Sequence, residues 1–332
     1  MAHATSSAGL PALELGQAPG RIDPVLLLAG LGWAGAAALT LLWPNATDDW
    51  AFTEELAYLA AAAAAVLALA GLLPRAPGLA RLRRAGPWFL VLGIGLAVWE
   101  IATAKLDLLP RPFFAPPQEL LTVYIDDWPR LVECVLASLS LLVTGYVLGA
   151  LTGFVTGIGL GWSRLVGYWV HPVLRLIGPL PPVAWLPVAF FTFPSSWAAS
   201  VFLIALATFV PVTILTWSGV ASVNSAYYDI ARTLGARNRF LVLKVAVPAA
   251  MPHVYVGLFM GMAASFAVLV VAEMMGVKAG LGWYLQWALG WAAYGNMYAA
   301  LLITALMCSG LVTLLFKVRD RHLAWQKGML KW

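Results

Sequence analysis

One polar stretch, residues 228–252, stands out between long apolar runs. Its cations, set among helix-forming residues, are Arg232, Arg237, Arg239 and Lys244. Gly235 lacks a Cβ and tolerates a left-handed backbone, while Pro248 and Pro252 disfavour helix continuation. The pattern predicts two short helices joined at Gly235 and closed by the prolines. Because four cations are too costly for a lipid core, we expect a docking element on a membrane face.

Two acids fall inside apolar runs, Glu100 and Glu273, each near the end of its run. Acids within a membrane are costly and often functional. Glu273, in the stretch 270–276, is the stronger candidate. It either lines a pathway or stabilises the helices, or it reaches an interface as an ordinary boundary residue. Glu100 has the same interfacial alternative.

The segment 178–194 is unusually rich in proline for an apolar run. The prolines are Pro179, Pro181, Pro182, Pro187 and Pro194. Each removes a backbone donor, and broken backbone at membrane depth is tolerated where it is buried in protein or lines a cavity. We expect Pro182, Trp185, Pro187 and Phe190 to line or gate a pathway. Plain kinking, with Trp185 as a packed aromatic, is the alternative.

Other chemistry is absent from the sequence. It contains no GxxxxGK[ST] phosphate loop, no HExxH motif and no Cys/His spacing for a metal. Cys134 and Cys308 are far apart in apolar runs, so we expect buried free thiols. The cations are scattered and form no groove for nucleic acid. An enzyme, a metal site and a nucleic-acid partner are therefore not expected.

The elements that position these residues are predicted to be membrane helices. The 332 residues are 62% hydrophobic and 11% charged, whereas soluble domains have about 25% charged residues. Runs of about 20 apolar residues match the length needed to cross a bilayer. We predict an all-α polytopic protein with eight spans: Pro24–Trp43, Glu55–Leu73, Gly86–Thr103, Glu133–Leu160, Leu176–Phe193, Trp197–Trp217, His253–Met275 and Met297–Phe316.

The cations are distributed unevenly over the connecting segments. With the N-terminus inside, the inner segments hold sixteen of the twenty Lys and Arg, and the outer segments hold Lys105, Arg111, Arg130 and Lys278. Lys and Arg concentrate on the cytoplasmic side of membrane proteins. We therefore expect both termini and the stretch 228–252 to face the cytoplasm.

Glycines recur at every fourth position of the fourth predicted span, and two more share this spacing in the seventh. They are Gly145, Gly149, Gly153, Gly157, Gly257 and Gly261. Such spacing lets helices approach closely, so packing is the expected role. We interpret residues 1–85 as an N-terminal tail, an added hairpin of two spans and a basic linker, and 86–332 as the core. A single inseparable bundle of eight helices is the alternative.

The stretch 228–252 resembles the EAA loop of binding-protein-dependent ABC importer permeases. In that family the order is roughly E-A-A, three residues, G, about nine residues, then I-x-L-P. The matching positions are Asp229, Ile230, Ala231, Gly235, Val247 and Pro248. Asp229 replaces the usual Glu and Ile230 the first Ala. The loop as a whole spans about 222–252.

Further motifs resemble the nitrate/sulfonate/taurine/bicarbonate branch of this family. They are Ala184–Pro187, Phe209–Pro211, Pro248–Pro252, Ala272–Met274, Gly280–Trp283 and Arg321–Trp325. The resemblance covers about residues 86–325. The hairpin in 1–85 is extra, and Phe193–Ser196 replaces an expected Gly-rich turn. The resemblance implies a six-helix MetI-like type I core with the two-helix hairpin added.

The resemblance also implies partners and site residues. Two permease copies would form the channel above two separate ATPase subunits, which bind ATP and Mg, and an extracytoplasmic binding protein would deliver the substrate. The implied coupling residues are Asp229, Ala231, Arg232, Leu234, Gly235, Ala236, Arg239 and Pro248. The location would be the bacterial inner membrane. The implied substrate is a small solute, an anion like nitrate, a sulfonate such as taurine, or bicarbonate. A stand-alone channel or secondary carrier is the alternative.

Overall fold

The computed structural model describes residues 23–47, 50–73, 79–110 and 112–325. These residues form helices and no strand. Seven helices are long and apolar enough to cross a membrane, or eight if one bent pair is counted as a span. The prediction of an all-helical chain with about eight spans is confirmed. The predicted tail before residue 23, and residues 74–78 of the predicted linker, lie outside the described residues.

The chain divides into two compact units, residues 1–122 and 123–332. In the first, α1 packs against both α2 and α4. Its helices are α1 (Pro24–Leu42), α2 (Thr53–Leu72), α3 (Ala80–Arg84) and α4 (Gly86–Glu100), and α4 continues into the π-helical turn η2 (Ile101–Lys105). The helix assigned by sequence to the core, Gly86–Thr103, thus packs against α1 of the hairpin. The boundary at residue 85 remains a prediction about the limits of the permease core.

A buried charge cluster joins α1 to the end of α4. The Lys105 ammonium donates to the carbonyl oxygens of Thr40 at 3.0 Å and Trp43 at 2.5 Å, and to Asn45 Oδ1 at 2.8 Å. It lies 3.6 Å from Glu100, and both side chains are buried. Glu100 also accepts from Thr40 Oγ1 and from Gln118 Nε2. The interfacial interpretation of Glu100 is therefore wrong, because its carboxylate is enclosed by donors inside the unit.

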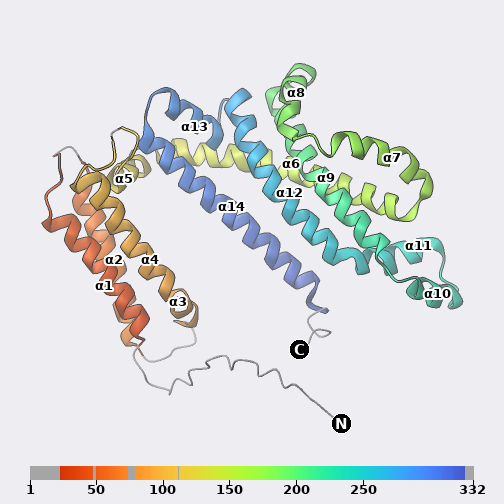
Figure 1. Cartoon of the computed structure of the whole chain (residues 1–332), viewed down its shortest axis with the longest axis horizontal. Helices are drawn as coiled ribbons and strands as arrows, with labels where there is room; N and C mark the ends of the chain where they lie inside the picture. Colours follow the sequence, from red (N-terminus) through yellow and green to blue (C-terminus); the bar gives the residue numbers. More distant parts are fainter. Residues whose placement is uncertain (1–22, 48–49, 74–78, 111, 326–332) are drawn as a thin grey trace, which may run out of the picture. The chain divides into compact units, whose positions relative to one another are not determined.

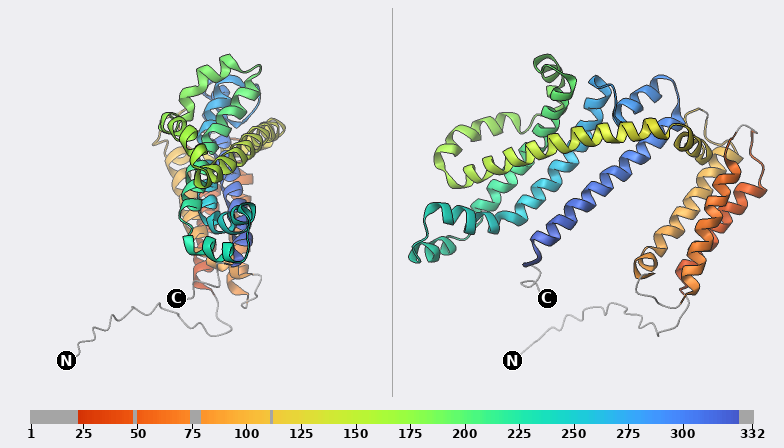
Figure 2. Two further views of the ribbon diagram at one scale, coloured as in Figure 1. Left: turned by 90° about the vertical axis from the view of Figure 1, so that its right-hand side faces the viewer. Right: turned by 180° about the vertical axis from the view of Figure 1, so that it is seen from behind.

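The second unit is built around three long helices, α6, α9 and α12. α6 and α12 both pack on α9, and Leu141, Leu203 and Leu269 are among the buried residues between them. The elements of this part are α5 (Pro117–Asp126), which begins in the first unit, then α6 (Trp128–Trp162), α9 (Ser196–Ala221), α12 (Val247–Gly276), α13 (Leu281–Gly290) and α14 (Tyr294–His322). Figure 1 shows α14 beside α12 and α6 crossing behind α9 and α12, and the view from behind in Figure 2 shows α6 crossing in front of them.

Glycine faces bring these helices together. A Cβ on Gly145 would lie 2.7 Å from Ile204 Cβ, and one on Gly149 would lie 2.3 Å from the carbonyl oxygen of Ala205. Gly153 and Gly157 meet α9 as closely, and Gly257 and Gly261 meet it from α12. With no Cβ between them, the backbones approach to distances that any side chain would prevent. These six positions therefore lie on helix–helix contacts.

The fifth predicted span, Leu176–Phe193, is not one continuous helix, which agrees with the broken backbone that its prolines predicted. The chain forms α7 (Arg164–Ile177), then a turn, the 3-10 helix η3 (Pro182–Trp185) and α8 (Leu186–Thr192). The two arms are bent by 90°, as the green segment of Figure 2 shows. The physical reason is the proline cluster at 179–182, which removes backbone donors where a helix would need them. α7 also begins twelve residues before the predicted start.

Candidate functional site

The polar stretch begins with a well-capped helix, α10 (Ser225–Thr233). Asn224 caps it, because its Oδ1 accepts from Ala226 N at 2.9 Å. Asp229 and Arg232 lie 3.6 Å apart on this helix, and both are more than half exposed. An exposed pair of this kind contributes little to stability. Both groups are therefore available to a partner.

Gly235 forms the turn after α10. Its φ is +83°, in the left-handed region that favours glycine. Gly235 N donates to Arg232 O at 2.9 Å, and Ala236 N donates to Ala231 O at 3.0 Å. These two bonds are those of a Schellman motif with glycine at its left-handed position. A Cβ added at Gly235 would meet no heavy atom within 4 Å, so the backbone alone requires the glycine.

The second half of the stretch differs from the prediction. Instead of a separate short helix closed by Pro248, the chain continues from α11 (Asn238–Phe240) through the π-helical turn η4 (Leu241–Ala246) into α12. One helical rod of 39 residues results, Asn238–Gly276. Pro248 lacks an N–H to donate, and π-helical adjustment next to such a residue lets the helix continue. The stretch is thus the beginning of a long helix.

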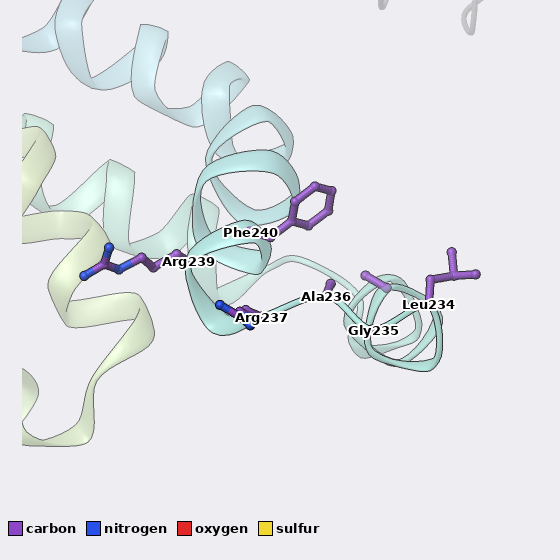
Figure 3. Close-up of a pocket in the computed structure, with 7 residues that line it drawn as sticks. Leu234, Gly235, Ala236, Arg237, Arg239 and Phe240 are labelled. Atoms are coloured by element: carbon purple, nitrogen blue, oxygen red, sulfur yellow. The ribbon is translucent and has the colours of Figure 1, made fainter.

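A groove of about 570 Å³ opens on the stretch. It is lined by Ala231, Leu234, Gly235, Ala236, Arg237, Arg239 and Phe240. Leu234 is 83% exposed and Phe240 is 52% exposed. Figure 3 shows Leu234 projecting outward near Gly235 and Arg239 pointing away from it. Exposed apolar side chains rimmed by cations are typical of a protein interface.

The structure brings five of the eight predicted coupling residues to this groove. They are Ala231, Leu234, Gly235, Ala236 and Arg239. Asp229 and Arg232 form the exposed pair on α10, and Pro248 lies away from the groove at the start of α12. We call the segment 222–246 the coupling element below.

The coupling element is mounted on the ends of three helices. Tyr228 in α10 packs edge-on against Trp162, the last residue of α6, with ring centroids 5.7 Å apart. Val220, Ala246 and Ala250 form a buried cluster behind it. Burial raises the pKa of the Tyr228 phenol, so it stays neutral. The contact of Trp162 with Tyr228 was not predicted from the sequence, because nothing around Trp162 indicates a partner so far along the chain.

Glu273 lies in a buried network of hydrogen bonds. Its carboxylate accepts from Ser138 Oγ at 2.6 Å and from Gly282 N at 2.7 Å. Ser138 Oγ in turn accepts from Leu281 N at 2.8 Å. Gly280, with φ +143°, lies against this carboxylate, and a Cβ added to Gly280 would be only 2.6 Å from Glu273 Cδ. This geometry fits the helix-stabilising alternative, since the carboxylate anchors the start of α13 to α6 and α12.

The other predicted pathway residues surround the bent segment. Trp185 and Phe190 pack against the core between α6, α9 and α12. Phe190 lies directly over Gly276, where an added Cβ would be 1.9 Å from its ring. Pro187 is exposed and Pro182 partly so. A role of these residues in a pathway stays a prediction.

The seven or eight long apolar helices define a multi-pass membrane protein, and the described residues include a polar element with an exposed, cation-rimmed groove. The profile of the family described as "Binding-protein-dependent transport system inner membrane component" matches residues 145–324. This chain belongs to that family and is an ABC importer permease subunit. The predicted resemblance is confirmed.

Individual relatives are similar over most of the chain. The nitrate import permease protein NrtB of Synechococcus elongatus is 29% identical over 256 residues, 72% of this chain and 87% of that protein. The bicarbonate transport system permease protein CmpB of the same species is 30% identical over 252 residues, 73% and 87%. A probable ABC transporter permease protein of Brucella abortus is 30% identical over 251 residues, 75% and 98%.

Proposed function

We propose that this permease passes a small anion of the nitrate or bicarbonate type into a bacterial cell as half of a homodimeric channel. The names of the relatives NrtB and CmpB support the substrate class. An extracytoplasmic binding protein delivers the anion, and two ATPase subunits beneath the channel bind ATP and Mg. This chain itself catalyses no hydrolysis. The uneven distribution of Lys and Arg supports cytoplasmic termini.

The observation that carries the proposal is the shape of the coupling element. An exposed Leu234 beside a Schellman turn gives the ATPase an apolar knob at a fixed position. Arg237 and Arg239 on the rim of the groove suit acidic groups on that subunit. Closure of the ATPase dimer then moves the coupling element together with α12. This movement switches the channel between its inward-facing and outward-facing states.

The alternative of a stand-alone channel or carrier leaves this element without a partner. The test is co-purification of the ATPase with a Leu234→Asp permease, since Asp places a charge at the centre of the contact. We expect loss of the ATPase and of its substrate-stimulated activity. Ala226→Asp is the matched control, because it adds the same charge to the exposed first turn of α10, outside the groove. Full retention of the ATPase by Leu234→Asp would contradict the proposal.

The substrate class is tested separately. Cells that lack this chain are complemented with it, and uptake of labelled nitrate and labelled bicarbonate is measured. We expect ATP-dependent uptake of one of the two anions. Uptake of a neutral or cationic solute alone would overturn the substrate class and leave the docking of the ATPase unaffected.

A further inference from the structure

The helix α7 carries three basic side chains on one side. Arg164, His171 and Arg175 are spaced by seven and four residues, which places them within about 40° around the helix axis. All three line a groove of about 1010 Å³ between α7, the end of α6 and α9. Across it, His171 packs edge-on against Trp217 of α9, with ring centroids 4.6 Å apart. The groove is therefore a basic surface with one aromatic wall.

The charge of this groove is not balanced by acids. No Asp or Glu occurs from residue 134 to residue 228, and Arg164 and Arg175 are the only Lys or Arg in that range. Across the described residues, the ion pairs within 4.0 Å include neither arginine. Two unpaired guanidinium groups in one concavity produce a positive potential that attracts an anion.

Another side of α7 is apolar and exposed. Leu165, Trp169, Val173 and Leu176 follow the helical repeat, and each is between 51% and 72% exposed. Tyr168 packs edge-on against Trp169. A helix with cations on one side and Leu and Trp on another lies in the interface of a bilayer, and aromatic rings favour the level of the lipid headgroups. This places the basic groove at the depth of the headgroups.

We propose that the groove binds the phosphate of an anionic phospholipid, with Arg164 and Arg175 as its charged ligands. Guanidinium groups bind phosphate oxygens through paired N–H donors. The volume of the groove suits a headgroup with part of its glycerol and exceeds the need of a bare inorganic anion. The apolar side of α7 lies among the acyl chains of the same leaflet.

The position of the groove gives such a lipid access to the coupling element. Trp162 lines the groove and also contacts Tyr228 of α10. Trp217, on its aromatic wall, lies one turn before the end of α9, and α10 follows that end. A bound lipid therefore stabilises the same helix ends that hold the coupling element.

The test uses the assembled transporter, with its ATPase subunits, in nanodiscs of phosphatidylcholine with or without phosphatidylglycerol. Native mass spectrometry counts the lipids that remain bound. Combining Arg164→Gln with Arg175→Gln should weaken phosphatidylglycerol binding roughly thirtyfold, about fivefold per cation. Combining Lys317→Gln with Arg321→Gln removes the same charge from exposed positions on α14, outside the groove, and should change nothing. Lysine at positions 164 and 175 should restore most of the binding.

Two outcomes would overturn the proposal. The first is equal phosphatidylglycerol retention by the wild type and the glutamine variant. The second is occupation of the groove by inorganic phosphate or nitrate in pure phosphatidylcholine, lost in the glutamine variant, which would assign the groove to a soluble anion. If the glutamine variant fails to assemble, the lysine variant decides: its binding of phosphatidylglycerol supports the lipid, and loss of binding in the assembled lysine variant overturns it.

Discussion

The indole of Trp162 packs edge-on against the phenol of Tyr228, with ring centroids 5.7 Å apart and planes inclined by 68°. Trp162 ends the 35-residue helix α6, and Tyr228 lies in the middle of α10. Because glycines of α6 pack closely on α9, this ring contact connects α10 to both α6 and α9.

Tyr228→Ala should weaken the connection between ATP hydrolysis and transport. Loss of an aromatic pair and its burial removes about 1 kcal/mol or more, which loosens α10 on its mounting. We expect a lower ratio of anion uptake to ATP hydrolysis in proteoliposomes. Tyr228→Phe should keep the ratio, and Tyr227→Ala should too, because Tyr227 is 62% exposed. A normal ratio in Tyr228→Ala would exclude the contact as a route of coupling.

Gly235→Val should abolish transport. A β-branched residue at φ +83° is strained by more than the roughly 1–2 kcal/mol of an ordinary residue, so the Schellman turn reorganises and Leu234 moves. Gly235→Asn should be mild, since Asn adopts this conformation readily and a Cβ meets no atom there. Substrate-stimulated ATPase activity distinguishes the two. An unchanged rate in the valine variant would refute the role of the turn.

Gly149→Ala should destabilise the second unit. Its Cβ would lie 2.3 Å from the carbonyl oxygen of Ala205, so α6 and α9 must separate, at a cost of about 1–3 kcal/mol. Thermal unfolding of the detergent-solubilised protein measures the loss. Gly310→Ala in α14 is the control, because its Cβ meets nothing within 4 Å. Equal melting temperatures for the two variants would contradict the tight packing.

Glu273→Ala should lower stability more than it alters substrate preference. It leaves two buried donors, Ser138 Oγ and Gly282 N, without their acceptor, at about 1–3 kcal/mol each. Glu273→Gln keeps an acceptor oxygen and should recover part of the loss. Melting temperature and the uptake ratio of nitrate to bicarbonate separate the two roles. A changed ratio at unchanged melting temperature would instead favour the pathway role.

Lys105→Met should destabilise the first unit strongly. It leaves the buried Glu100 without its cation, and removing one partner of a buried pair costs about 3–5 kcal/mol. Adding Glu100→Gln should restore much of the stability, because no unpaired charge then remains. Limited proteolysis of residues 23–105 in membranes measures the effect. A double variant as unstable as Lys105→Met alone would argue against the charge as the cause.

The apolar runs predicted most of the helices, because span length follows from bilayer thickness. Hydropathy gave the wrong start for the span 176–193. The missing donors of Pro179, Pro181 and Pro182 did indicate broken backbone, which the structure shows as a 90° bend. Pro248 predicted the end of a short helix. That prediction is wrong, because a π-helical turn lets the helix continue through Pro248.

The turn at Gly235 could be predicted from the sequence alone, because a left-handed backbone at one position depends on the residue type there and not on distant contacts. Partners distant in the chain were not predictable in this way. Glu100 and Lys105 looked like boundary residues. Yet a donor to Glu100, Thr40 Oγ1, and the acceptors of Lys105 come from 40–45, about sixty residues earlier. Ser138 is likewise 135 residues from Glu273. Only the packing of helices brings such groups together.

The continuity of α6 has a thermodynamic consequence. Near one end of this helix Ser138 holds the start of α13, and at the other end Trp162 holds α10. The two residues are about 36 Å apart along the helix axis, at 1.5 Å per residue. If a ligand that reorders Leu281 changes the affinity for the ATPase at α10 by some factor, then ATPase docking changes the affinity for that ligand by the same factor. Under the proposed function, delivery of the anion outside and docking of the ATPase inside would then be linked by a single coupling free energy.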